Sequence, residues 1–151
     1  MPSPSDASHP KKDNEDLVVR FFADMGDSYA QMCVAFDRYL ADDCVWANQG
    51  LPEVRGKARI FEFLRDFADQ IGLESVNGQV YNIASAGPVV LTERHERWTG
   101  ADGKILVESL PVMGTFEVED GRIRAWRDYF DPTRFAHLVG ADNGDGAEDA
   151  R

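Results

Sequence analysis

The sequence predicts an α+β fold in which a curved antiparallel or mixed sheet forms a cone-shaped half-barrel around a deep pocket, with three helices from the N-terminal side of the chain. Two observations support this prediction. Amphipathic helical patterns are confined to the first half of the chain, and strand-like alternation with glycine-containing turns fills the second half. Helices followed by a run of long strands are typical of an α+β fold with its helices on one side. A strongly bent sheet of this size closes partly around a cavity.

Three segments carry apolar residues at helical spacing, over residues 15–25, 28–40 and 57–71. Gly26 breaks the first segment, Ser28 caps the second, and Gly72 ends the third. A short strand is predicted over residues 42–49, followed by a turn at residues 50–52.

Four longer strands are predicted in the second half, over residues 74–84, 88–98, 104–119 and 122–131. Glycine-containing turns such as residues 101–103 and 119–121 join them, so we expect long antiparallel strands. A short closing helix starts at Pro132 and runs through Val139.

The length of 151 residues fits one domain, and 43% hydrophobic residues can supply its core. We expect a single cone-fold domain over residues 15–139, a disordered leader over 1–14 and a disordered acidic tail over 140–151. The net charge of −11 argues against nucleic acid or an anionic membrane as a partner, because both attract basic proteins. A neutral or weakly charged small ligand is favoured.

The sequence suggests no membrane segment, disulfide or metal site. No apolar run approaches the ~20 residues of a membrane span, and no signal-peptide core is expected. Cys33 and Cys44 fit free thiols, and the three histidines (His9, His95 and His137) share no ligand spacing. We expect a cytoplasmic protein without a metal or cofactor.

The run from Ile123 to Asp131 alternates as a strand does, which places Trp126, Asp128 and Phe130 on one face. An acid between two large aromatic residues indicates a carboxylate in an apolar lining. Desolvation would raise its pKa toward the range that is useful for proton transfer. The alternative is an edge strand whose Asp128 points to water.

The run from Leu91 to Trp98 has charged residues on both faces. Thr92, Arg94, Glu96 and Trp98 share one face, and Glu93, His95 and Arg97 share the other. The face with Trp98 is the expected interior, where Arg94 could bridge Glu96 and another carboxylate. Two alternatives stay open: an exposed charge ladder, and a bulge that would turn His95 inward in place of Glu96.

Trp46 and Asn48 share one face of the short strand at residues 42–49. A buried asparagine can donate and accept hydrogen bonds and so position a water molecule, although Asn48 also fits an ordinary turn residue. Together with Asp128, Glu96 and Arg94, these residues form a general acid/base set without a side-chain nucleophile.

Five features look like those of the limonene-1,2-epoxide hydrolase family: Thr92-Glu93-Arg94, the acid at Glu96, Gly114-Thr115-Phe116, the turn at residues 119–123 and above all residues 126–131. The resemblance covers residues 16–139. That family has the nuclear-transport-factor-2-like cone fold, which ketosteroid isomerases and SnoaL-like cyclases share. The resemblance also implies a homodimer.

The resemblance implies roles for the polar residues. Asp128 would deprotonate an attacking water, Asn48 would help to hold that water, and Arg94 would bridge the two acids. Glu96 stands where the family has an aspartate that protonates the epoxide oxygen, and is one methylene longer. Trp46 stands where the family has a tyrosine that gives the water its third hydrogen bond; an indole can donate but cannot accept.

We therefore predict an enzyme that adds water to a small hydrophobic epoxide in one general acid/base step. One alternative is a cofactor-free isomerase, lyase or dehydratase that acts by proton transfer on a terpenoid, steroid or aryl substrate. A non-catalytic ligand-binding module is the third reading, disfavoured because a binder has no use for an acid–arginine–acid set. Five aromatic residues are expected to contact the substrate: Trp46, Trp98, Phe116, Trp126 and Phe130.

Overall fold

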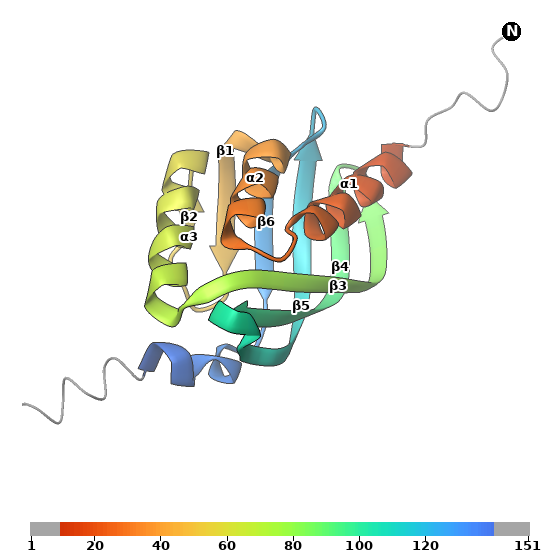
Figure 1. Ribbon diagram of the computed structural model, residues 1–151. Helices are drawn as coiled ribbons and strands as arrows, with labels where there is room; N and C mark the ends of the chain where they lie inside the picture. Colours follow the sequence, from red (N-terminus) through yellow and green to blue (C-terminus); the bar gives the residue numbers. More distant parts are fainter. Residues whose placement is uncertain (1–9, 141–151) are drawn as a thin grey trace, which may run out of the picture.

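The computed structural model describes residues 10–140, with the helices gathered on one face of a curved sheet (Figure 1). The helices are α1 (Pro10–Asp24), α2 (Tyr29–Tyr39) and α3 (Lys57–Ile71), and further helical residues begin at 136. The strands are β1 (Leu40–Asn48), β2 (Val54–Arg55), β3 (Leu73–Ala86), β4 (Val89–Gly100), β5 (Ile105–Glu119) and β6 (Arg122–Tyr129). Short 3-10 turns occupy Ala101–Gly103 and Pro132–Arg134.

The six strands form one mixed sheet in the order β2-β1-β6-β5-β4-β3. All neighbouring strands are antiparallel except β1 and β6, which run parallel and pair Trp46 with Trp126 and Asn48 with Asp128. The sheet is curved but not closed into a barrel, so the predicted α+β half-barrel is confirmed. The topology therefore places the first strand, β1, beside the last strand, β6.

Local sequence signals explain the helix boundaries. The Ser28 side chain accepts a hydrogen bond from the Gln31 amide (3.2 Å) at the start of α2. At the end of α3, Gly72 adopts a left-handed conformation (φ 72°) and its amide bonds to the carbonyl of Ala68. The helices bury one stripe each against the sheet, where Phe21, Phe36 and Trp126 pack edge to face.

The structure differs from the prediction at one helix boundary and in one additional strand. Helix α1 begins at Pro10, so residues 10–14 belong to it and not to an unstructured leader. Proline is favourable in a first helical turn because its missing amide hydrogen has no helical partner there. The two-residue strand β2 was not predicted, because so short a segment carries no periodic signal. The rest of the predicted leader and the predicted tail from residue 141 lie outside the described residues.

Within residues 10–140, every helix is too short or too polar to cross a membrane.

Candidate active site

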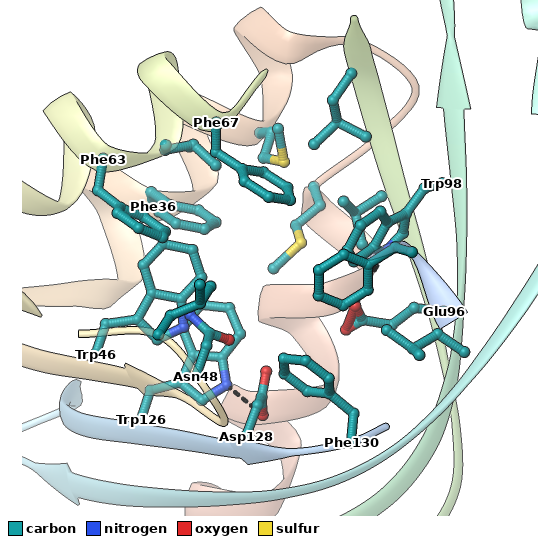
Figure 2. A pocket seen from close by; sticks show the side chains of 18 residues that line it. Phe36, Trp46, Asn48, Phe63, Phe67, Glu96, Trp98, Trp126, Asp128 and Phe130 are labelled. Carbon is teal, nitrogen blue, oxygen red and sulfur yellow. Dashed lines mark hydrogen bonds between the residues drawn. The ribbon is translucent and has the colours of Figure 1, made fainter. Parts of the chain in front are cut away.

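A cavity of about 70 Å³ lies between the concave face of the sheet and helices α2 and α3 (Figure 2). Eight of its eighteen lining residues are aromatic: Phe36, Trp46, Phe63, Phe67, Trp98, Trp126, Phe130 and Phe135. Only three lining residues carry an amide or a carboxylate, namely Asn48 from β1, Glu96 from β4 and Asp128 from β6. The cavity therefore favours an apolar ligand whose chemistry is confined to one small polar region.

Arg94 of β4 lies behind this wall and joins the two acids. Its Nη2 donates to Asp128 Oδ2 (2.5 Å) and to Glu96 Oε2 (3.1 Å), while its Nε donates to the same Glu96 oxygen (3.2 Å). All three side chains are buried, and that of Arg94 is fully inaccessible. The Phe22 ring covers the guanidinium at 4.5 Å. One cation thus fixes two carboxylates from different strands at the cavity.

Two tryptophans hold the carboxylates from the cavity side. Trp126 Nε1 donates to Asp128 Oδ1 (2.8 Å), and Trp98 Nε1 donates to Glu96 Oε1 (3.2 Å). In Figure 2, Asp128 lies beside Trp126, and Glu96 lies across the cavity near Trp98. Each acid therefore receives one hydrogen bond from an indole and at least one from Arg94. These hydrogen bonds fix the orientation of both carboxylates.

Thr92 and Gly114 complete the support of Arg94. Thr92 Oγ1 accepts from Arg94 Nη1 (3.3 Å) and donates to the carbonyl of Gly114 (3.2 Å). Gly114 pairs with both Thr92 and Asp128 on the neighbouring strands. A Cβ at position 114 would occupy the space of Arg94 Nη1 and would lie 2.6 Å from Asp128 Oδ1. Only glycine leaves room there for the arginine and the carboxylate to meet.

The buried position of Asp128 raises its pKa from an ordinary 3.8 to about 6. Desolvation is the largest cause and the negative charge of Glu96 adds to it, whereas the charge and hydrogen bond of Arg94 oppose it. The pKa of Arg94 is raised, because the two acids outweigh the opposing effect of burial.

Comparison with known proteins assigns the family. The family model for the limonene-1,2-epoxide hydrolase catalytic domain matches residues 14–138 of the chain. The chain belongs to the limonene-1,2-epoxide hydrolase family. All of the polar side chains described above fall within the matched residues.

Individual relatives agree with this membership. Epoxide hydrolase EphG of Mycobacterium tuberculosis is 40% identical over 95 residues, which is 63% of this chain and 60% of the relative. YesE of Bacillus subtilis, an uncharacterized protein, is 31% identical over 93 residues, 58% of this chain and 59% of YesE. The aligned segments thus span about three fifths of each of these curated relatives.

Solved structures show the same fold. A limonene-1,2-epoxide-hydrolase-like epoxide hydrolase from M. tuberculosis superposes with a TM-score of 0.66 at 28% identity, over 85% of this chain and 90% of that chain. A SnoaL-like protein from Jannaschia superposes with a TM-score of 0.70 at 15% identity, over 90% of this chain and 97% of that chain. The second likeness concerns the fold alone.

The structure brings together most of the site residues that the sequence predicted for a limonene-1,2-epoxide hydrolase. Asn48, Glu96 and Asp128 face the cavity, and Arg94 bonds to both acids from behind it. His95, the open alternative to Glu96, lies on the outer face and contacts Ser109. Four of the predicted aromatic residues also line the cavity: Trp46, Trp98, Trp126 and Phe130.

Phe116 is not a cavity residue, so its prediction as a substrate contact is wrong. Its ring is fully buried beneath the site, where it stacks on Trp126 (5.6 Å between centroids) and packs edge to face on Phe22. It points to the same face of the sheet as Trp126, but α1 covers that part of the face. Alternation predicts the face of a residue, and only the position of α1 decides between core and cavity.

Sequence reasoning missed two groups of residues. Thr92 and Gly114 appeared in the motifs of the family resemblance, but no role at the site was predicted for them. The helical and C-terminal lining residues Phe36, Phe63, Phe67 and Phe135 belong to apolar stretches that fit an ordinary core. Their aromatic content was the available signal, but helical periodicity alone does not distinguish a cavity wall from close packing.

Proposed function

We propose that this chain is an epoxide hydrolase that adds water to a small, uncharged, apolar epoxide in a single step. The observation that carries the proposal is the pair of buried acids, Asp128 and Glu96, which one arginine joins at the polar end of an aromatic cavity. Membership of the limonene-1,2-epoxide hydrolase family supports it.

In the proposed reaction, Asp128 as a carboxylate removes a proton from a water molecule that Asn48 helps to hold. The water oxygen forms a bond to one epoxide carbon while the bond from that carbon to the ring oxygen breaks. Glu96 gives its proton to the departing oxygen, which yields a diol. Arg94 keeps the two acids in register, and the aromatic wall holds the hydrocarbon part of the substrate.

The test is turnover of limonene oxide, cyclohexene oxide and styrene oxide in oxygen-18 water. We expect labelled diol from the wild type, and a fall of at least ~10²-fold in Asp128→Asn, the range of one acid/base group. Glu96→Gln should lose activity as well, whereas its matched control Glu93→Gln, on the outer face of β4, should keep it. Diol formation that survives Asp128→Asn would remove Asp128 from the mechanism.

A second candidate is a proton-transfer isomerase or lyase that acts on a similarly apolar substrate. The observation that favours it is Trp46, whose indole can donate a hydrogen bond but cannot accept one from a water. Asp128 would then take a proton from carbon and Glu96 would stabilise the developing charge on oxygen. A folded protein that makes no diol from any of the epoxides would support this candidate over the hydrolase.

We also propose that the chain forms a homodimer through the outer face of its sheet. Four adjacent strands expose large apolar side chains there: Tyr81 of β3, Leu91 of β4, Met113 of β5 and Tyr129 of β6. Light scattering on the eluting protein should give twice the chain mass, and Met113→Glu should shift the mass toward the monomer. A wild-type monomer would contradict the proposal.

A further inference from the structure

Glu96 accepts hydrogen bonds from both directions along strand β4. Arg94, two residues earlier, donates to Glu96 Oε2 through Nε (3.2 Å) and Nη2 (3.1 Å). Trp98, two residues later, donates to Glu96 Oε1 through Nε1 (3.2 Å) and is itself only 7% exposed. The two oxygens of this carboxyl group therefore have different partners. One contacts the arginine behind the cavity wall, and the other contacts an indole that lines the cavity.

The surrounding structure fixes the indole of Trp98 in place. The register of β4 on β5 shifts between Glu96 and Trp98, and a bulge of this kind redirects the side chains beside it. Two rings then pack against the indole, that of Phe135 at 5.0 Å and that of Phe67 at 5.8 Å between centroids. Figure 2 shows Trp98 and Glu96 on the same side of the cavity. The N–H of Trp98 is therefore a donor of fixed position.

The hydrogen bonds also indicate which oxygen of Glu96 holds a proton when this residue is an acid. Oε2 already accepts two N–H groups, whereas Oε1 accepts one. The oxygen with fewer donors has room for the proton and can still accept from the indole through a lone pair. It is also the oxygen that contacts a cavity residue. The structure thus favours Oε1 as the proton-bearing atom.

We propose that Trp98 is a positioning residue for this acid: its N–H holds Glu96 Oε1 at the cavity, and the proton on Oε1 is the one given to the epoxide oxygen. This role rests on the proposed function. The Oε1–H bond breaks and an O–H bond forms at the epoxide oxygen, which keeps the electron pair of the broken carbon–oxygen bond. The proton of the attacking water goes to Asp128.

Trp98 supports this step in two ways. Glutamate has one rotatable bond more than aspartate, and Arg94 holds Glu96 through one oxygen only, so the second contact removes a rotation that the arginine permits. A misplacement of about 1 Å can lower a rate ~10²-fold. As Oε1 loses its proton, the hydrogen bond from the indole also becomes charge-assisted and stronger. Trp98 therefore stabilises the transition state more than the bound substrate.

The indole signals of a proton–nitrogen-15 correlation spectrum test the contact without turnover. The three tryptophans should give three signals, which the single Trp→Phe variants that fold assign, directly or by elimination. Glu96→Asp withdraws the carboxyl group from the indole, so it should move the Trp98 signal most. Asp128→Asn, the matched control, should instead move the signal of Trp126, which bonds to Asp128. A Trp98 signal that stays in place in folded Glu96→Asp would overturn the proposal.

A double-mutant cycle tests the role in catalysis, with the panel epoxide that the wild type hydrolyses fastest. Trp98→Phe keeps an aromatic ring and removes the N–H, so kcat should fall roughly tenfold with a smaller change in KM. In the Glu96→Asp background, where the acid no longer reaches the indole, the same change should lower kcat by less than about twofold. The control Phe135→Leu alters the packing of the indole and keeps its N–H, so its effect should be equal in both backgrounds.

The two proposals fail in different ways. A protein that makes no diol from any panel epoxide would refute the hydrolase and, with it, this role of Trp98. Labelled diol, together with equal losses from Trp98→Phe in both backgrounds, would keep the hydrolase and refute the role of Trp98 alone, because the residue would then act only by packing.

Discussion

Strand β4 carries charged residues on both of its faces, and the two faces differ in what their charges do. On the inner face, Arg94 is fully buried and joins two acids. On the outer face, Arg97 contacts Glu108 at 2.7 Å, but their side chains are 54% and 66% exposed. The contact distances are similar, so distance does not identify the functional pair. Burial and the second acid do, because they raise the pKa of Asp128.

The largest effect should come from Arg94→Gln on the inner face. It leaves Asp128 and Glu96 buried without their cation, so we expect a loss of about 3–5 kcal/mol in the free energy of unfolding and loss of turnover. Urea unfolding and diol formation measure the two effects. A free energy of unfolding within about 1 kcal/mol of the wild type would show that the inner cluster contributes no more to stability than an exposed ion pair does.

Gly114→Ala should have the next largest effect, because its Cβ would displace Arg94 or Asp128. We expect about 1–3 kcal/mol of destabilisation and a fall in kcat of ~10²-fold. The matched control is Gly100→Ala, where the new Cβ would lie 2.9 Å from the carbonyl oxygen of Gly72 and would contact neither acid. Both variants should lose stability, but only Gly114→Ala should also shift the pH profile. Equal activities in the two variants would contradict a special role of Gly114.

The pH profile should report the inner face directly. Burial raises the pKa of Asp128 to about 6, and a base must be ionised to accept a proton, so kcat/KM should fall as the pH drops below about 6. Below that pH we expect about a tenfold loss per unit. A profile that stays flat down to pH 5 would show that Asp128 is not desolvated, or is not the base.

Thr92→Val should have a moderate effect. It removes the hydroxyl that accepts from Arg94 Nη1 while preserving shape, so kcat should fall several-fold, the value of one hydrogen bond. Thr92→Ser should restore both kcat and the pH profile. The control Thr99→Val, at another position of β4, breaks a hydroxyl contact with Ser75 of β3 and should leave kcat unchanged. Failure of serine to rescue would point to packing by the threonine methyl group.

The smallest effect belongs to Arg97→Gln on the outer face. An exposed ion pair contributes about 0–1 kcal/mol, so unfolding and turnover should stay close to wild type. Added salt should reduce even that difference, since water and ions screen the pair. A large loss of activity would mean that the outer face takes part in function, for example through the proposed dimer.

Sequence alternation predicted the inner face of β4 and of β6 because a strand turns every second side chain to the same side. Arg94, Glu96 and Trp98 were expected together for this reason, as were Trp126, Asp128 and Phe130. Apolar residues at helical spacing and the left-handed Gly72 gave α3 its limits. Strand alternation could not separate Phe116 from the cavity residues, because α1 covers one part of a face and leaves another open.

The sequence by itself thus determined the elements, their buried faces and the kinds of groups at the site, since these depend on neighbours two to four residues apart. The tertiary structure alone decided that β1 lies parallel to β6, which sets Trp46 and Asn48 beside Trp126 and Asp128. It also decided that Arg94 reaches Asp128, 34 residues away, across a strand that has glycine at position 114. Such contacts depend on how strands far apart in the chain pair and bend, and no local pattern records that.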